Sequence, residues 1–298
     1  MPRTYPVGSL GAGEVYEKST RLVSVDVTDD RSTRLLLIRH GESVSTVDRC
    51  IGGPRTCRGL SPLGHQQAER LRDRLATTGE VDAEVLYSSQ YPRALQTAAI
   101  LAPALGGLAV VEDAGFGEHD PGELCDGMSY AEFTERYGNR EWDDPFAESF
   151  PGGETIAAFH FRVGLALHHA VTTHAGRSIV IACHGGVIDA VFRILLHAPP
   201  TGSFQLHTLN TALTEFEVAG PRTWKLHRYN DASHLAGLPA ESPRVAHAAA
   251  APGGDPADLP GDAATDTSDA VDAAEDSSDT SDMPDTVVAA DVPDPAVR

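Results

Sequence analysis

Two histidines in the sequence follow short apolar runs that have the character of buried strands. Residues 35–38 lead into Arg39 and His40, and residues 178–183 lead into His184; a glycine follows each histidine. An imidazole can attack phosphorus or move a proton, and a guanidinium presents a rigid fork of donors that suits phosphate oxygens. Arg39, His40 and His184 are therefore candidates for phosphate chemistry.

A second arginine fits the same chemistry. Arg93 lies in the first turn of a predicted helix that follows the predicted strand at 85–89. A cation is unfavourable beside the positive end of a helix unless an anion lies nearby, so this position indicates an anion site. Open α/β sheets place ligands at the carboxyl ends of their strands, and we expect Arg39, Arg93, His40 and His184 to share one site there.

The elements that would position these residues alternate between strand and helix. Apolar runs and helical spacing predict strands at 35–38, 85–89, 109–112 and 178–183, and helices at 61–79, 92–105, 155–174 and 187–196. Residues 44–60 are expected to be a loop, residues 113–150 an insertion over the site with a helix at 130–137, and residues 206–229 two or three strands that complete the sheet. The pattern predicts an α/β fold.

The chain divides into three parts by composition. Residues 1–33 are expected to be an N-terminal extension with a short edge strand at 21–27, and residues 34–232 the catalytic domain. Residues 233–298 are predicted to be a disordered tail. Between Asp255 and Asp294 there are thirteen acids, and Arg298 is the one base, so this segment carries −12 of the formal charge of −20. The tail is expected to be a solvated, charge-repelling segment, and the sequence names no partner for it.

Composition also limits the compartment and the cofactors. Neither a signal peptide nor an apolar run of the roughly 20 residues that a membrane span needs is found. Four cysteines lack both the spacing of zinc sites and the density of a disulfide scaffold, so a cytoplasmic protein is expected. No metal site, cofactor, nucleic-acid or membrane partner is predicted, and a homo-oligomer stays open.

Five motifs, in order, resemble the histidine phosphatase (phosphoglycerate mutase-like) superfamily. They are Arg39-His-Gly-Glu-Ser43, Leu60-Ser-Pro-Leu-Gly64, Ser88 to Arg93 before Gln96-Thr97, Pro151-Gly-Gly-Glu154, and His184-Gly185. The resemblance spans about residues 34–229. It implies a three-layer α/β/α sandwich with a mostly parallel central sheet and an insertion that caps the site.

The resemblance also implies roles for individual residues. His40 is the expected nucleophile, and Arg39, Arg93, His184 and Gly185 are expected to hold the phosphoryl oxygens. In-line phosphoryl transfer needs mainly positioning and charge stabilisation, which arginines and a second imidazole supply without a metal. A covalent phosphohistidine divides hydrolysis into two easier steps.

Two carboxyl groups compete for the role of general acid and base. Glu118 fits more positions of the family's acidic and glycine-rich pattern, with one extra residue near Leu124. An alignment on Phe116 and Gly117 instead nominates Asp113. Glu118 is the preferred candidate and Asp113 the alternative.

Two features depart from the pattern or extend it. Thr46 stands where many family members have asparagine, and its hydroxyl is expected to reach a phosphate oxygen. Arg55 and Arg58 lie in the loop over the site and are candidate substrate contacts, with solvated positions as the alternative.

The insertion is acidic, which bears on the substrate. It contains Glu132, Glu135, Glu141, Asp143, Asp144 and Glu148, against the two bases Arg136 and Arg140. Like charge would repel a phosphoglycerate, which carries a carboxylate as well as phosphate. We therefore expect a metal-independent phosphatase acting on a small phosphorylated metabolite with a neutral or cationic leaving group. The alternatives are a phosphoglycerate mutase-type isomerase and a weakly active, phosphate-binding regulatory protein.

Overall fold

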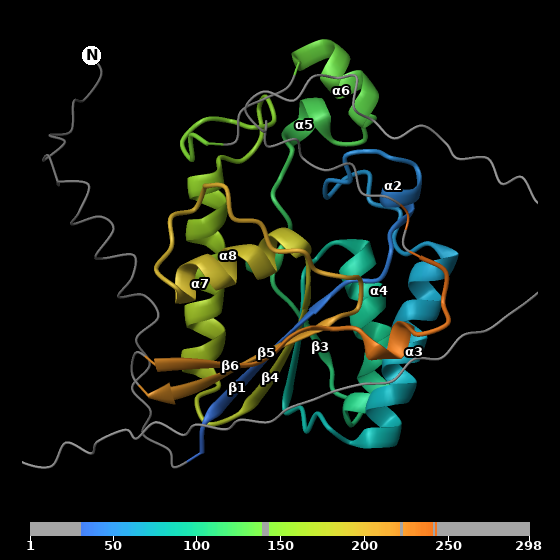
Figure 1. Cartoon of the computed structure of the whole chain (residues 1–298), viewed down its shortest axis with the longest axis vertical. Coiled ribbons are helices and arrows are strands. Elements are labelled where there is room, and N and C mark those ends of the chain that lie inside the picture. The colour runs from blue at the N-terminus through green and yellow to red at the C-terminus, as the bar shows by residue number, and fades with distance from the viewer. Residues whose placement is uncertain (1–30, 139–142, 221–222, 241, 243–298) are drawn as a thin grey trace, which may run out of the picture. The chain divides into compact units, whose positions relative to one another are not determined.

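A computed structural model describes residues 31–138, 143–220, 223–240 and 242 (Figure 1). Strands β1 (Thr33–Arg39) and β4 (Ser178–Cys183) pair in parallel at its centre. Their register sets Arg39 opposite Cys183, so His40 and His184 leave the sheet at the same level. The two predicted apolar runs therefore deliver both histidines to one edge.

The sheet has six strands in the order β3-β2-β4-β1-β5-β6. Strands β2 (Val85–Ser88) and β3 (Val110–Glu112) extend the parallel half, whereas β5 (Leu213–Gly220) and β6 (Thr223–Asp231) run antiparallel. The sheet is thus mixed rather than mostly parallel. The chain enters β5 from the carboxyl edge without a crossover helix, where Thr211 N–H donates to Arg39 O at 2.8 Å, and must therefore run back against β1.

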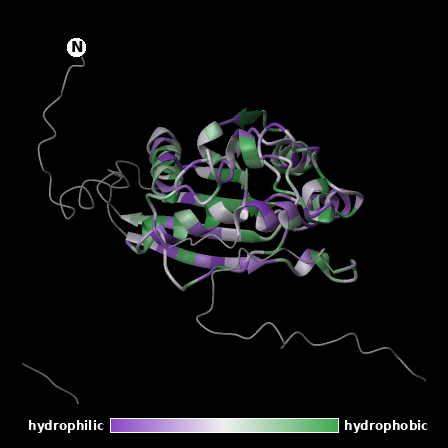
Figure 2. Ribbon diagram, turned by 90° about the horizontal axis from the view of Figure 1, so that it is seen from above, coloured by the Kyte–Doolittle hydropathy of each residue, from purple (hydrophilic) through white to green (hydrophobic). Residues whose placement is uncertain are grey.

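Helices cover both faces, as the predicted three-layer sandwich requires (Figure 1). Side chains alternate along β1, so Leu35 and Leu37 face one core cluster and Leu36 and Ile38 the other. The first cluster contains residues of α7 (Ile156–Thr173) and α8 (Gly185–Leu195), and the second contains residues of α3 (Pro62–Thr78) and α4 (Pro92–Leu101). Hydrophobic residues run along the strands between the layers (Figure 2).

Short helices form the cap over the carboxyl edge (Figure 1). Helices α5 (Gly122–Cys125) and α6 (Tyr130–Tyr137) belong to the predicted insertion. An apolar cluster supports them, formed by Ile51, Cys125, Met128, Phe133 and Phe150. Helix α2 (Val44–Val47) lies in the segment predicted as loop, and its four residues are too few for helical spacing to be visible. The 3₁₀ turns are η2 (Ala102–Leu105), η3 (Ala114–Phe116) and η4 (Ser233–Leu235).

Several predictions lie outside the described residues. They are the edge strand at 21–27, most of the N-terminal extension, Arg140, Glu141, and the tail beyond residue 242. Within the described residues, no helix is long and apolar enough to cross a membrane.

Candidate active site

His40 is held as a single neutral tautomer. Its Nδ1 lies 2.6 Å from Gly41 O, and a carbonyl can only accept, so Nδ1 carries the proton. Arg93 Nε donates to His40 Nε2 at 3.1 Å, so Nε2 has an available lone pair. This is the nitrogen able to attack an electrophile in the cavity that His40 lines.

The pKa of His40 is held well below its ordinary value of 6.5. The largest cause is burial of the ring, followed by the positive charges of Arg93 and Arg39. The imidazole is therefore unprotonated at neutral pH, as a nucleophile must be.

The two arginines are fixed by backbone oxygens. Arg39 Nη1 donates to Thr208 O at 2.6 Å, and Arg93 Nη1 donates to Gly52 O at 3.0 Å. Both guanidinium groups line the cavity although their residues are 8% and 5% exposed. Positive charge with restricted access to water is the arrangement that stabilises a dianionic group most strongly.

His184 is completely buried, beside His40. The ring centroids of the two histidines are 5.0 Å apart in an edge-to-face arrangement. His184 Nε2 lies 2.8 Å from Ser89 Oγ, and Nδ1 has no hydrogen-bond partner among the described residues. Burial and the neighbouring positive groups lower the pKa of this histidine well below 6.5. His184 is not itself among the residues that line the cavity.

The remaining motif residues shape the backbone behind His40. A Cβ atom on Gly41 would lie 2.4 Å from Gly64 O, and one on Gly64 would lie 2.0 Å from Glu42 O. Glycine is thus needed at both positions for close approach of the chain after β1 to the start of α3. Glu42 is buried and accepts from Ser61 Oγ at 2.7 Å, which anchors the N-terminal end of that helix.

Glu118 lines the same cavity as His40. Its Oε2 accepts from Gly186 N–H at 3.1 Å, and its Oε1 accepts from His119 N–H at 3.1 Å. Asp113 does not line the cavity, because its carboxylate caps η3 by accepting from Gly115 N–H at 2.7 Å. The geometry favours Glu118 over Asp113 as the acid of the site.

Arg162 positions the Glu118 loop, a role that no local sequence pattern indicated. Its Nη1 donates to three carbonyls at 3.1 Å and its Nη2 donates to Glu118 O at 3.2 Å; the three are those of Ala114, Gly115 and Gly117. Glu154 of the fourth motif holds the guanidinium with distances of 2.8 and 3.0 Å. The role of Glu154 is therefore to orient Arg162, and through it the loop.

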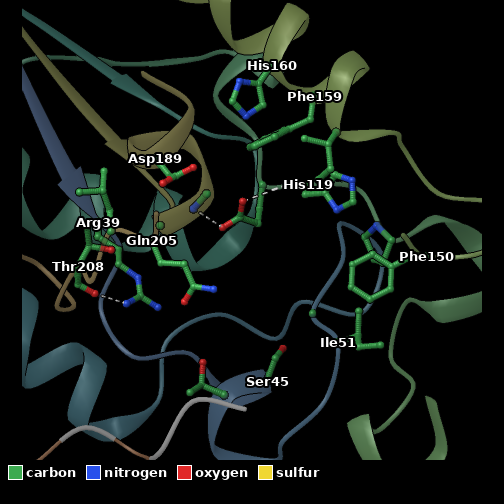
Figure 3. A pocket seen from close by; sticks show the side chains of 18 of the residues that line it. Arg39, Ser45, Ile51, His119, Phe150, Phe159, His160, Asp189, Gln205 and Thr208 are labelled. Atoms are coloured by element: carbon green, nitrogen blue, oxygen red, sulfur yellow. Dashed lines mark hydrogen bonds between the residues drawn. The ribbon is translucent and has the colours of Figure 1, made fainter. Parts of the chain in front are cut away.

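These groups surround a cavity of about 470 Å³ (Figure 3). Its wall joins loop 43–52, the start of α7, the first turns of α8 and loop 200–208. Residues that the sequence analysis did not identify as lining it include Arg49, His119, Phe159, His160, Asp189, Gln205 and Thr208. They come from segments far apart along the chain, and only the fold brings them together.

The other predicted contacts are divided. Thr46 and Gly185 line the cavity, and Thr46 Oγ1 also lies 3.0 Å from Ser43 Oγ. Arg55 and Arg58 are not among the lining residues. Arg55 pairs with Glu123 at 2.9 Å and lies near Asp126, and Arg58 pairs with Asp48. The two arginines, which were candidates for contact with substrate, are therefore paired with carboxylates outside the cavity.

Fewer acidic side chains of the cap line the cavity than the composition of this segment suggested. Among the described acids of residues 130–150, Asp143 lines the cavity, whereas Glu132, Glu135 and Asp144 are exposed and are not among the lining residues. Within the described residues, no cluster of three or more His, Cys, Asp or Glu side chains could hold a metal ion.

Comparison with known proteins shows that the chain is similar to phosphatases and to phosphoglycerate mutase-like proteins. The sequence model of the histidine phosphatase superfamily (branch 1) matches residues 35–232. Phosphoglycerate mutase-like protein 4 from Arabidopsis thaliana is 29% identical over 214 residues, which are 70% of this chain and 90% of the relative. A metal-independent phosphoserine phosphatase from the same plant is 26% identical over 210 residues, 69% of this chain and 84% of the relative.

A solved structure agrees in fold. A mutant phosphoserine phosphatase from Entamoeba histolytica, in complex with phosphoserine, is 27% identical, with a TM-score of 0.57. The similarity covers 68% of this chain and 99% of that one. The paired histidines, the two buried arginines and the match over residues 35–232 lead to one conclusion: the chain belongs to branch 1 of the histidine phosphatase superfamily and is a phosphatase of that type.

Proposed function

We propose that the enzyme hydrolyses a phosphate monoester in two steps, through a phosphohistidine on His40 Nε2. The observation that carries this proposal is the tautomer of His40. Because Gly41 O accepts from Nδ1, the lone pair lies on Nε2, beside Arg93 in the cavity that Arg39 also lines.

Binding of substrate exchanges one hydrogen bond. In the free enzyme Arg93 Nε donates to His40 Nε2 at 3.1 Å, and an incoming phosphoryl group must separate the two. The guanidinium then donates to phosphoryl oxygens, and Nε2 attacks phosphorus as the ester oxygen leaves on the opposite side. Arg39 stabilises the same charge, and the buried His184 packs against the ring of His40.

Glu118 serves as acid and then as base. In the first step its protonated carboxyl gives a proton to the departing alkoxide, so the leaving group departs as an alcohol. In the second step the carboxylate takes a proton from the water that attacks the phosphohistidine. Phosphate is released and both His40 and Glu118 return to their starting states.

Positive side chains supply the charge that a metal would otherwise provide. The two buried arginines, fixed by Thr208 O and Gly52 O, are preorganised for a dianion. A relative bearing the name metal-independent phosphoserine phosphatase supports hydrolysis without a metal. Its named substrate also supports a small phosphorylated metabolite here.

The free thiols support a reducing, cytoplasmic location. None of the four cysteines forms a disulfide in the described residues, and Cys57, Cys125 and Cys183 are buried. Fractionation of the source cells would test this location, and recovery outside the cytoplasm would contradict it.

Hydrolysis of an aryl phosphate in excess chelator tests the mechanism. The wild type should turn over, and His40→Ala should lose more than about 1,000-fold in kcat. His169→Ala, at an exposed position on α7, is the matched control and should retain activity. An acid-labile, base-stable phosphoprotein should be trapped in the wild type and not in His40→Ala.

Two outcomes would reject the proposal. Chelator-sensitive turnover that survives in His40→Ala would exclude the phosphohistidine route. Trapped phosphate with no hydrolysis would instead favour a mutase-type isomerase, in keeping with the mutase-like relative, or a regulatory phosphoprotein.

A further inference from the structure

The cavity is larger than a phosphoryl group requires. Its volume of about 470 Å³ lies in the range of sites for whole small molecules, roughly 300–1,000 Å³. The phosphoryl position between His40, Arg39 and Arg93 occupies one part of it. The remainder must accommodate the leaving group, and its wall determines which leaving group fits.

Asp189 lies in that wall, one helical turn beyond the phosphoryl position. Gly186, whose N–H holds Glu118, and Asp189 are three residues apart on α8 and therefore share a face of the helix. Asp189 lines the cavity (Figure 3). Its Oδ2 accepts from Arg193 Nε at 2.6 Å, and no hydrogen bond of Oδ1 is found within the described residues.

Arg193 also lines the cavity, but most of its guanidinium is engaged within the protein. Its Nη1 donates to Pro199 O at 3.0 Å and to Thr201 O at 3.3 Å, and its Nη2 donates to Phe204 O at 2.5 Å. The guanidinium is thus engaged in holding loop 199–204, and the residue is 8% exposed. The pair presents one fixed acceptor to the cavity but carries no net charge.

The Asp189–Arg193 pair carries no net charge and leaves Asp189 Oδ1 available, so it favours an uncharged hydrogen-bond donor on the ligand. A carboxylate in this position would meet the negative Asp189, and an ammonium group would lie close to the positive Arg193. A hydroxyl can donate to Asp189 Oδ1 and is repelled by neither charge. Gln205, directed into the cavity beside Arg39, adds an uncharged amide (Figure 3).

The neighbouring wall has the same character. Phe159 and His160 at the start of α7 line the cavity with an aromatic surface (Figure 3). Burial lowers the pKa of His160 to about 4, so its ring is neutral at pH 7. Aromatic rings beside fixed acceptors suit a carbon skeleton that bears hydroxyl groups.

We infer that the ester has an uncharged, hydroxyl-rich leaving group of the polyol or sugar type, recognised by Asp189 with Gln205. This inference rests on the proposed function and deepens it by assigning the substrate class. The strongest competing feature is Arg49, an exposed cation that also lines the cavity and would favour a carboxylate.

Three small esters separate the possibilities. Glycerol 3-phosphate, 3-phosphoglycerate and O-phosphoethanolamine present a neutral, an anionic and a cationic leaving group of similar size. We expect kcat/KM of the wild type for glycerol 3-phosphate to exceed each of the others about tenfold or more. A preference for 3-phosphoglycerate that is lost in Arg49→Gln would overturn the inference.

Asp189→Asn tests the acceptor without changing the shape of the wall. The amide oxygen can still accept from Arg193, which turns the NH₂ group toward the cavity and converts an acceptor into a donor. The ratio of kcat/KM for glycerol 3-phosphate over 3-phosphoglycerate should fall about tenfold. Gln205→Leu, on a different segment, should lower the same ratio by a smaller factor, about threefold.

A matched control variant completes the kinetic test. Glu217→Gln changes an acid paired with Lys225 outside the cavity and should leave the ratio unaltered. Equal losses on all three esters in Asp189→Asn would reject the subsite, even where aryl phosphate hydrolysis upholds the phosphatase.

If none of the esters is hydrolysed, calorimetric titration with glycerol 3-phosphate tests the subsite by binding alone. Binding that weakens about tenfold in Asp189→Asn would support the subsite although the proposed function had failed. Equal affinity of the two proteins would overturn it.

Discussion

At the scale of single residues, chemical type is less decisive than environment. His40 and His169 have the same side chain, but one is buried between two arginines with Nδ1–H committed to a carbonyl and the other is exposed on α7. The same holds for the acids Glu118 and Asp113. Asp113 and Glu118 are close together in the sequence, and their hydrogen bonds distinguish them.

Replacement of these two acids should give different results. Glu118→Gln keeps the shape and removes the transferable proton, so kcat for an ester with a poor leaving group should fall about 100-fold or more. An aryl phosphate, whose leaving group needs less protonation, should lose less. Asp113→Asn keeps the cap of η3 and should change kcat less than about threefold. Steady-state kinetics on both esters would check this, and a larger loss in Asp113→Asn would reverse the assignment.

At the scale of elements, the site depends on how closely the chain after β1 approaches α3. No side chain fits between Gly41, Glu42 and Gly64, since a Cβ on Gly64 would lie 2.0 Å from Glu42 O. A shift of this backbone would move His40, two residues before Glu42.

Gly64→Ala should therefore lower both stability and activity. We expect the free energy of unfolding to fall by about 2–4 kcal/mol, measured by urea denaturation, with a parallel loss of kcat/KM. Gly164→Ala is the matched control, also within a helix, where the new methyl group would make an ordinary contact at 3.5 Å. It should change stability by less than about 1 kcal/mol, in the stabilising direction. Equal effects of the two would contradict the packing argument.

An ionic network joins α3 to the antiparallel edge of the sheet. Arg74 donates to Asp231 at 2.6 Å and to Glu80 at 2.6 Å, and Arg228 bridges Glu80 and Glu215 at 2.7 and 2.9 Å. These groups are mostly shielded from water, so the network is screened less than an exposed pair.

Arg74→Ala should cost about 1–3 kcal/mol of unfolding free energy, because it leaves two partly buried carboxylates without this partner. Arg72→Ala, on the same helix, removes the more exposed ion pair between Arg72 and Asp73. It should cost about 0–0.5 kcal/mol. Urea denaturation at low and high salt would compare them. A loss in Arg74→Ala no larger than that in Arg72→Ala would show that the network contributes little.

At the scale of the whole molecule, the buried histidines couple folding to pH. Burial lowers the pKa of His40, His184 and His119, and brings those of His160 and His234 to about 4. In the unfolded chain these groups take up protons near their ordinary value of 6.5, so the unfolded state binds more protons than the folded state below that pH.

Stability should therefore fall as the pH drops from 7 to 5. Each such histidine contributes up to about 1.4 kcal/mol per pH unit within this window. A second loss should begin near pH 4.5, because ion pairs hold the pKa of Glu80 at about 2. Urea denaturation at pH 7, 6 and 5 in phosphate-free buffer would measure the first window, and a flat profile would contradict it.

The fold and the site were accessible to sequence reasoning to different degrees. Parallel pairing of the strands before His40 and His184 was predictable, because both runs are apolar on consecutive residues and need cover on two faces. The antiparallel direction of β5 was not, since it depends on the route of the loop before it. The ion pairs of Arg55 and Arg58 could not be predicted either, because their acidic partners cannot be assigned from spacing.

The sequence by itself determined which side chains follow the strands: two histidines and two arginines at strand ends and a helix start, recognisable because strands and helix starts are encoded by neighbouring residues. The tertiary structure alone decided which carboxyl faces the cavity, that Arg162 holds its loop, and that Asp189 and Arg193 form the wall beyond the phosphoryl position. The contacts of Glu118 with Gly186 and Arg162, and the packing of α8 at the cavity, join residues tens of positions apart, and local propensity and periodicity contain no information about them.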